Sequence, residues 1–78
     1  MNNKLFYAQD IAEQIGGKVT ANRVGRVAKK LNLKIDPTYG KWVIEFTGML
    51  NVSVFLYNEA AVKILKEYIF LHYKELLP

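Results

Sequence analysis

The sequence predicts a small α+β domain with two short helices, a β-hairpin and a longer C-terminal helix. Apolar residues recur every three or four positions, as on one face of a helix, in the segments 8–15, 20–31 and 59–77. Two runs rich in β-branched and aromatic residues, 41–46 and 52–57, are separated by a short segment that contains glycine, which predicts an antiparallel hairpin.

Length and composition place the chain among small globular proteins. Its 78 residues suffice for one domain and not for two, and 51% of them are apolar while 23% are charged. The absence of cysteine excludes disulfides and cysteine-based zinc sites. The apolar runs are shorter than a membrane span, and the N-terminus lacks the apolar stretch of a signal peptide. We therefore expect residues 1–78 to form a single domain in the cytoplasm, without membrane contact.

The N-terminal part predicts a short strand followed by a short helix. Residues 5–7 are apolar and aromatic, as in a strand or arm that packs on the core. In the helix that follows, one face is apolar, at Ile11, Ala12 and Ile15. Gly16 and Gly17 then end the helix, because glycine readily adopts the left-handed conformation found at helix ends.

A second helix is predicted to begin at Thr20, whose hydroxyl can accept a hydrogen bond from a backbone N–H of the first turn. Its buried stripe has the spacing i, i+3, i+4 and i+7, at Val24, Val27, Ala28 and Leu31. Asn32 can end this helix. Gly25 lies in its interior, where glycine costs about 1 kcal/mol relative to alanine. Either another backbone approaches Gly25 closely, or the glycine is merely tolerated.

A turn is predicted before the hairpin, because Pro37 cannot continue a helix and Gly40 permits a sharp reversal. Alternate residues of a strand share a face. Trp42, Ile44 and Phe46 therefore lie on one face of the hairpin, and we expect this face to cover the core.

The C-terminal segment predicts a long helix, 59–77, with Asn58 as its N-cap. Its apolar residues form more than one stripe, so this helix is apolar nearly all round. A small domain has little else with which to bury such a helix, and we expect a second subunit to cover it. The alternative is a helix wedged between the hairpin and the first two helices. The residues expected at the oligomer interface are Leu65, Ile69, Phe70, His72, Tyr73 and Leu76.

Positive charge is concentrated in one third of the chain. The segment 16–41 has seven basic residues against Asp36 alone, a net charge of +6, whereas the remainder has four basic and six acidic residues, a net charge of −2. Such a segregated cationic region is typical of a domain that binds polyanions, since contacts with phosphates release counterions. A basic surface that only keeps the protein soluble is the alternative interpretation.

Two helices joined by a glycine-containing link, the second with a cationic face, have the arrangement of a helix-turn-helix. In this motif the first helix braces the second, here 20–31, which enters the major groove of DNA. Arg can donate two hydrogen bonds to guanine, and Asn can pair with adenine. The residues expected to read bases are Asn22, Arg23 and Arg26. The further DNA contacts, mainly to phosphates, are expected at Lys18, Lys29, Lys30, Lys34 and Lys41.

The hairpin then takes the place of the wing in a winged helix-turn-helix. Its tip, 47–51, has no basic residue. A wing that touches DNA normally brings positive charge. This wing is therefore either structural, or it uses Thr47 and Asn51 as neutral donors to phosphates.

A family resemblance rests on three short motifs. The sequence DIAEQIG at 10–16, followed by VTANRVGR at 19–26, resembles the helix-turn-helix signature of bacterial and phage regulators. With YGKW at 39–42, the chain is similar to the C-terminal DNA-binding domains of phage antirepressors and related regulatory proteins. In the common signature the cap follows the glycine more closely, whereas here Gly17 and Lys18 lengthen the turn. The resemblance implies DNA binding in transcriptional control.

We therefore expect a transcriptional regulator of phage or bacterial origin that binds duplex DNA sequence-specifically as a homodimer, with its recognition helices about 34 Å apart. The alternative is a protein-interaction or assembly module that uses the apolar C-terminal helix. A third possibility is a fragment of a larger regulator. No enzymatic role, cofactor, metal site or small-molecule substrate is predicted. His72 is the only histidine, and the chain has no glycine-rich phosphate loop.

Overall fold

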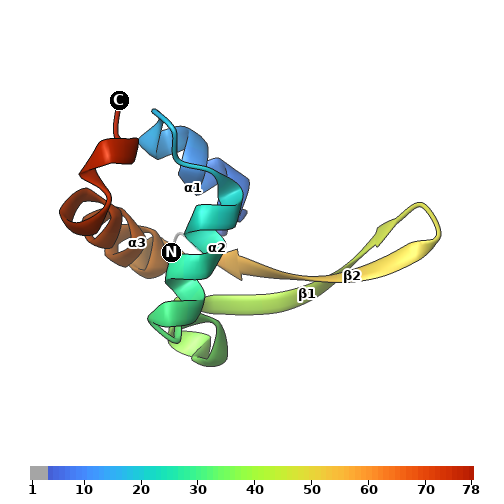
Figure 1. Cartoon of the computed structure of the whole chain (residues 1–78). Coiled ribbons are helices and arrows are strands. Elements are labelled where there is room, and N and C mark those ends of the chain that lie inside the picture. The colour runs from blue at the N-terminus through green and yellow to red at the C-terminus, as the bar shows by residue number, and fades with distance from the viewer. Residues whose placement is uncertain (1–3) are drawn as a thin grey trace.

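The computed structural model describes residues 4–78, which form three α-helices and one two-stranded antiparallel hairpin. The predicted α+β class and the predicted order of elements are confirmed, and residues 1–3 of the predicted domain lie outside the described part. Figure 1 shows the helices gathered into one body, from which the hairpin projects as a long arm. In chain order the elements are α1 (Ala8–Ile15), α2 (Ala21–Lys30), β1 (Gly40–Thr47), β2 (Leu50–Tyr57) and α3 (Glu59–His72).

The N-terminal segment pairs with the end of the hairpin. The backbone N–H of Phe6 donates to the carbonyl of Tyr57 at 2.7 Å, and the N–H of Tyr57 donates to the carbonyl of Phe6 at 2.8 Å. The predicted short strand is thus reduced to a bridge at one residue. Helix α1 begins directly afterwards, and the carboxylate of Asp10 accepts a hydrogen bond from the N–H of Tyr7 at 2.9 Å, which satisfies a donor at the helix start.

One hydrophobic core holds the three helices together. The predicted inner faces of the first two helices are confirmed, because their apolar stripes point into this core, with Leu31 half-buried at its border. The base of the hairpin also contributes to it. The core residues are Ile11, Ala12, Ile15, Val19, Val24, Val27, Ala28, Leu33, Phe55, Tyr57, Ala61, Val62, Leu65 and Ile69.

Helix α3 is part of this core. Asn58 caps it as predicted, since its side-chain oxygen accepts a hydrogen bond from the N–H of Ala61 at 3.0 Å. Leu65 and Ile69 have an exposed fraction of 0%. The predicted subunit interface is therefore wrong at these two positions, because α1, α2 and β2 of the same chain cover them. The wedged helix was the alternative prediction, and it describes this side of α3.

The last turns of the chain differ from the prediction. Helix α3 ends at His72 instead of continuing to Leu77, because Tyr73 leaves the helical conformation with φ −134° and ψ 49°. A 3₁₀ turn, Lys74–Leu76, follows. Of the other residues predicted at the interface, Tyr73 and Leu76 pack against the core, whereas Phe70 and His72 are exposed. No helix within residues 4–78 has the length and apolar character to cross a membrane.

The link between α1 and α2 holds the C-terminal segment. The backbone N–H of Lys18 donates to the carbonyl of Leu76 at 2.7 Å. Gly17 has φ +61°, and a Cβ at this position would overlap the Leu76 carbonyl. The residues that lengthen the turn therefore give the C-terminus a place to dock, which the sequence motif did not indicate.

The hairpin is tighter than predicted, and most of its length lies outside the body. Strands β1 and β2 are joined by two residues, of which Gly48 has φ +63°, as in a two-residue hairpin turn. Near the base, Phe55 is only 6% exposed, but Ile44 and Phe46 are 74% and 65% exposed. The prediction that the face of Trp42 covers the core is therefore wrong for its outer part, because the strands extend past the helices (Figure 1).

Candidate nucleic-acid interface

Helix α2 is held from both its start and its inner side. The hydroxyl of Thr20 accepts a hydrogen bond from the N–H of Arg23 at 3.1 Å, so the predicted cap is confirmed. Val24, Val27 and Ala28 are at most 1% exposed and fix the helix against the core. The opposite side of α2 therefore faces solvent.

Three polar residues form the outermost row of this side. Asn22, Arg26 and Lys29 are all exposed, and their spacing of i, i+4 and i+7 places them on one line along the helix. We call them the outward row. It combines an amide, a guanidinium and an ammonium group, which are the donor types that contact base edges and phosphates in DNA.

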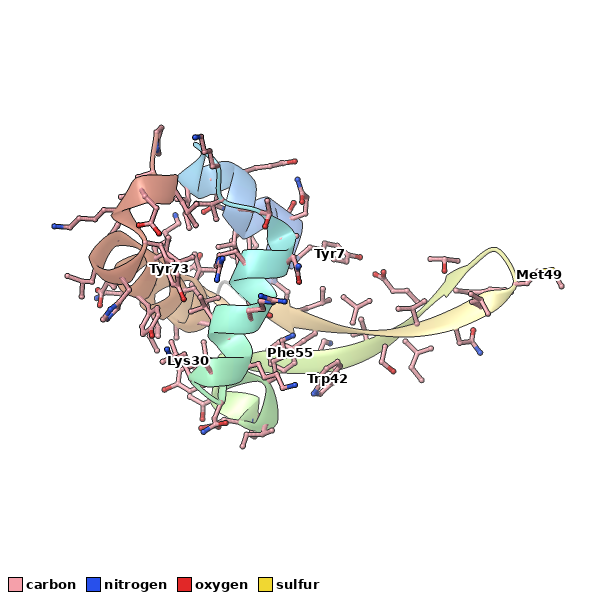
Figure 2. The ribbon with its side chains drawn as sticks, in the orientation of Figure 1. Tyr7, Lys30, Trp42, Met49, Phe55 and Tyr73 are labelled. Atoms are coloured by element: carbon pink, nitrogen blue, oxygen red, sulfur yellow. The ribbon has the colours of Figure 1, made fainter. Side chains whose placement is uncertain are left out.

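Two further cations lie on the flank of α2 that faces α3. The guanidinium carbon of Arg23 lies 4.7 Å from the ring centroid of Tyr73, and Nζ of Lys30 lies 5.8 Å from that of Tyr68. Such cation–π contacts contribute about 0.5–1 kcal/mol at exposed sites. Figure 2 shows Tyr73 on the side of α3 and Lys30 towards the end of α2. These tyrosines orient the two cations without neutralising them.

The charge of Lys30 is reinforced by its surroundings. The nearby Tyr68 hydroxyl raises the pKa of Lys30 above the ordinary value for lysine, and Tyr73 adds to this effect. The side chain is exposed. Lys30 therefore remains a cation over the whole physiological range and presents that charge to solvent.

The remaining three predicted contact residues lie around the ends of α2. Lys18 is exposed in the link that precedes Thr20. Lys34 and Lys41 follow the other end of the helix and line one shallow hollow beside Trp42. The structure thus brings the outward row and its flank together on one helix, whereas these three lysines border it at opposite ends.

Among the described residues, no other backbone segment comes close to α2 at Gly25. The nearest neighbour of a Cβ built at this position is Nζ of Lys34, at an ordinary contact distance of 3.6 Å. The hypothesis of a close backbone approach is therefore wrong. What remains is a tolerated glycine beside a flexible lysine.

Tyr68 and Tyr73 are the functional candidates that the sequence did not identify. Tyr73 was predicted at a subunit interface, and Tyr68 was only one of several apolar positions on the last helix. Their role depends on how α3 packs against α2, and those helices are separated in the chain by the whole hairpin. A local pattern carries no signal for such a contact.

Comparisons with protein-family models, with curated proteins and with solved structures find no match to this chain.

Proposed function

We propose that this chain binds duplex DNA as a regulator of the winged helix-turn-helix type, with α2 as the helix that enters the major groove. The observation that carries the proposal is the outward row: Asn22, Arg26 and Lys29 are exposed together on a helix whose other side is fixed in the core. The strongly cationic segment 16–41 surrounds this row and supports attraction to a polyanion.

The position of each side chain supports a division of roles. Asn22 and Arg26 lie in the first two turns of α2, the part of a recognition helix that reaches base edges. Arg23 was predicted to read bases, but it lies with Lys30 on the flank, where tyrosine rings orient both cations. In this proposal Arg23, Lys30 and Lys29 contact the phosphates on either side of the groove. In this proposal α1 braces α2 through their shared core.

The hairpin adds little to DNA affinity in this proposal. Between Trp42 and Tyr57 the sequence has one charged residue, Glu45, which is acidic. Affinity for phosphates comes mainly from Lys and Arg. The binding charge is therefore supplied by α2 and its two ends, and the hairpin occupies the place of a wing without its usual charge.

The double substitution Arg26→Ala/Lys29→Ala tests the role of the outward row. Binding of a labelled random-sequence duplex is measured by fluorescence anisotropy across a series of salt concentrations. The wild type should bind more weakly as salt rises, and the variant should lose about two units of the log–log salt slope, because about one counterion is released per phosphate contact. The fold should be unchanged, since both side chains are exposed.

A matched control removes the same charge elsewhere. Lys63→Ala/Lys74→Ala also takes two exposed cations from the chain and lowers its net charge equally, but on α3 and the turn after it. It should retain the wild-type slope. Equal losses in both variants, or no binding of the wild type at low salt, would overturn the proposal.

Selection of duplexes from a randomised pool tests the reading of sequence. The wild type should enrich one motif, and Asn22→Ala should relax it at a single adenine position, because a bidentate Asn–adenine pair provides about 1–3 kcal/mol of discrimination. Binding of random DNA should change little. Identical selected motifs for the two proteins would remove Asn22 from the proposed readout.

The alternative function was an assembly module that uses the apolar C-terminal helix. Leu65 and Ile69 cannot serve it, because neither has exposed surface. The exposed apolar surface lies mainly on the hairpin instead, and it is considered next.

A further inference from the structure

The outer part of the hairpin is an exposed apolar surface. Strands β1 and β2 extend past the helices as the hairpin arm, residues 43–54. Figure 2 shows Met49 at its far end, while Trp42 and Phe55 lie near its base. Among the described residues, four large apolar side chains of the arm are at least 65% exposed: Ile44, Phe46, Met49 and Leu50.

Strand pairing divides this surface into two faces. Residues directly opposite each other on paired strands lie on the same face of the sheet. One face, which we call the tryptophan face, consists of Trp42, Ile44, Phe46, Asn51, Ser53 and Phe55. None of these residues is charged. Trp42 itself is 54% exposed, although its indole N–H donates to the carbonyl of Lys34 at 2.9 Å.

The opposite face is already tied to the body. The Tyr7 hydroxyl donates a hydrogen bond to the carboxylate of Glu45, which lies on this face. Val43 and Val54 are half-buried there. Of the two faces, the tryptophan face therefore has the larger and less covered apolar side chains.

The chemistry of the tryptophan face does not fit a nucleic acid. A duplex presents a dense row of phosphates, and proteins that bind it place Lys or Arg along the contact. The tryptophan face offers three exposed large apolar side chains, Trp42, Ile44 and Phe46, together with Asn51 and Ser53. Its natural partner is another uncharged, apolar protein surface.

We propose that the tryptophan face joins two copies of this chain about a twofold axis. A twofold interface brings the same patch of both copies together, so it must be complementary to itself. An uncharged apolar face meets this requirement, even though each chain carries a net charge of +4, because the excess charge lies in the segment 16–41 and not on the arm.

The size of the patch supports a second copy as its occupant. A fully exposed aromatic side chain presents about 150–250 Å², so Trp42, Ile44 and Phe46 together expose on the order of 400 Å² of the tryptophan face, to which the exposed Asn51 and Ser53 add. With the flanking backbone this approaches the ~800 Å² per partner of a standard interface. A lone two-stranded ribbon is also marginally stable in water, and a second ribbon packed on it would supply the missing apolar contacts.

The mass of the protein in solution tests this proposal directly. Sedimentation equilibrium of the wild type in the micromolar range should give about 18 kDa, twice the 9.0 kDa of one chain. The double substitution Ile44→Ser/Phe46→Ser should weaken self-association at least ~100-fold and give the monomer mass. Circular dichroism should show an unchanged fold, because both side chains are largely exposed in the single chain.

The matched control lies on α3. Phe70→Ser/Leu71→Ser removes two apolar side chains that are 46% and 71% exposed, on the helix that the sequence predicted as the interface. This variant should remain dimeric. A monomeric wild type, a dimeric arm variant, or dissociation by the α3 variant alone would each overturn the proposal.

Trp42 provides an independent measurement, because it is the only tryptophan in the chain and lies on the proposed interface. On dilution of the wild type, its emission should shift to the red and acrylamide should quench it more strongly. The arm variant should show the exposed signal at every concentration. A dimer whose Trp42 quenching does not change on dissociation would place the interface elsewhere. Neither measurement involves DNA, so the result stands apart from the function proposed for α2.

Discussion

Helix α3 and the hairpin arm are both rich in apolar residues, yet the apolar stripe of α3 is buried and the large apolar side chains of the arm are exposed. On α3 the stripe Ala61, Val62, Leu65 and Ile69 is at most 8% exposed. In the arm, Ile44, Phe46, Met49 and Leu50 are 65–96% exposed. Apolar content alone therefore does not decide which segment is buried. Whether an apolar segment is buried depends on which other segments of the same chain pack against it.

A small set of contacts holds the base of the hairpin against the helices. The indole N–H of Trp42 donates to the Lys34 carbonyl, and the ring of Trp42 packs edge-on against Phe55 with centroids 5.4 Å apart. The Tyr7–Glu45 hydrogen bond holds the other face. Beyond these contacts, within residues 4–78, the two strands hydrogen-bond as a sheet only with each other, and their large apolar side chains are mostly exposed. The comparison between α3 and the arm can be tested with substitutions in the body and in the arm.

The largest effect is expected from a matched pair of leucines. Leu65→Ala should lower the free energy of unfolding by about 2–5 kcal/mol, because it opens a cavity in the core. Leu50→Ala makes the same change in the arm, where the side chain is 69% exposed, and should cost less than about 0.5 kcal/mol. Urea unfolding at low protein concentration measures both. Similar losses would mean that the arm is buried in solution.

The next effect concerns Tyr57, which marks the buried base of the arm. Burial raises the pKa of Tyr57 to about 12, above the ordinary value of 10.0. As the pH rises above about 10, the unfolded chain loses this proton first, so the free energy of unfolding should fall until about pH 12, by roughly 2–3 kcal/mol in total.

Tyr57→Phe removes the ionisable group while keeping the ring. Its unfolding free energy should lack this part of the alkaline decline, whereas the two proteins should show parallel pH dependence below about pH 9. Urea titrations at a series of alkaline pH values provide the comparison. An identical decline in both proteins would show that Tyr57 is not the group responsible.

A third test compares two glycines with nearly the same positive φ angle. Gly17 in the body has φ +61° and Gly48 at the tip of the arm has φ +63°. Alanine should strain both sites by about 1 kcal/mol. Only at Gly17 would the new Cβ also overlap the Leu76 carbonyl, whereas nothing lies within 4 Å at Gly48.

Gly17→Ala should therefore destabilise the protein by about 1–3 kcal/mol, clearly more than Gly48→Ala. Thermal unfolding followed by circular dichroism ranks the two variants. Equal losses would contradict the docking of the C-terminal segment on the link between α1 and α2.

The difference between contacts that are local in the chain and contacts between distant segments explains what could be predicted from the sequence. Thr20 and Asn58 identify helix starts because the cap and its partner lie within one turn of the chain. Whether an apolar face is buried or exposed, in contrast, is not determined by neighbouring residues in the sequence. Leu65 is buried and Ile44 is exposed because α3 packs against α1 and α2 while the hairpin runs past them.

For the candidate site, the helical period placed the outward row on the exposed side of α2, but it did not separate this row from Arg23, which was predicted to read bases and lies on the flank. Asn22, Arg26 and Lys29 follow from the 3.6-residue repeat once Val24 and Val27 are taken as buried. The contacts of Arg23 with Tyr73 and of Lys30 with Tyr68 could not be predicted in this way, because they depend on the packing of two helices that are distant in the chain.

The smallest effect, and the only stabilising one, is expected at Gly25. This glycine lies inside α2 with helical neighbours, and a Cβ there would meet only the flexible end of Lys34 at 3.6 Å. Gly25→Ala should raise the free energy of unfolding by about 0.5–1 kcal/mol, because alanine loses less backbone freedom on folding. Unfolding by urea measures the gain. Because Gly25 lies beside Lys34 and outside the outward row, binding of random duplex DNA should stay unchanged. A loss of DNA binding in a more stable protein would show that the hollow lined by Asn22, Gly25 and Lys34 must remain open, and would extend the interface from the outward row into that hollow.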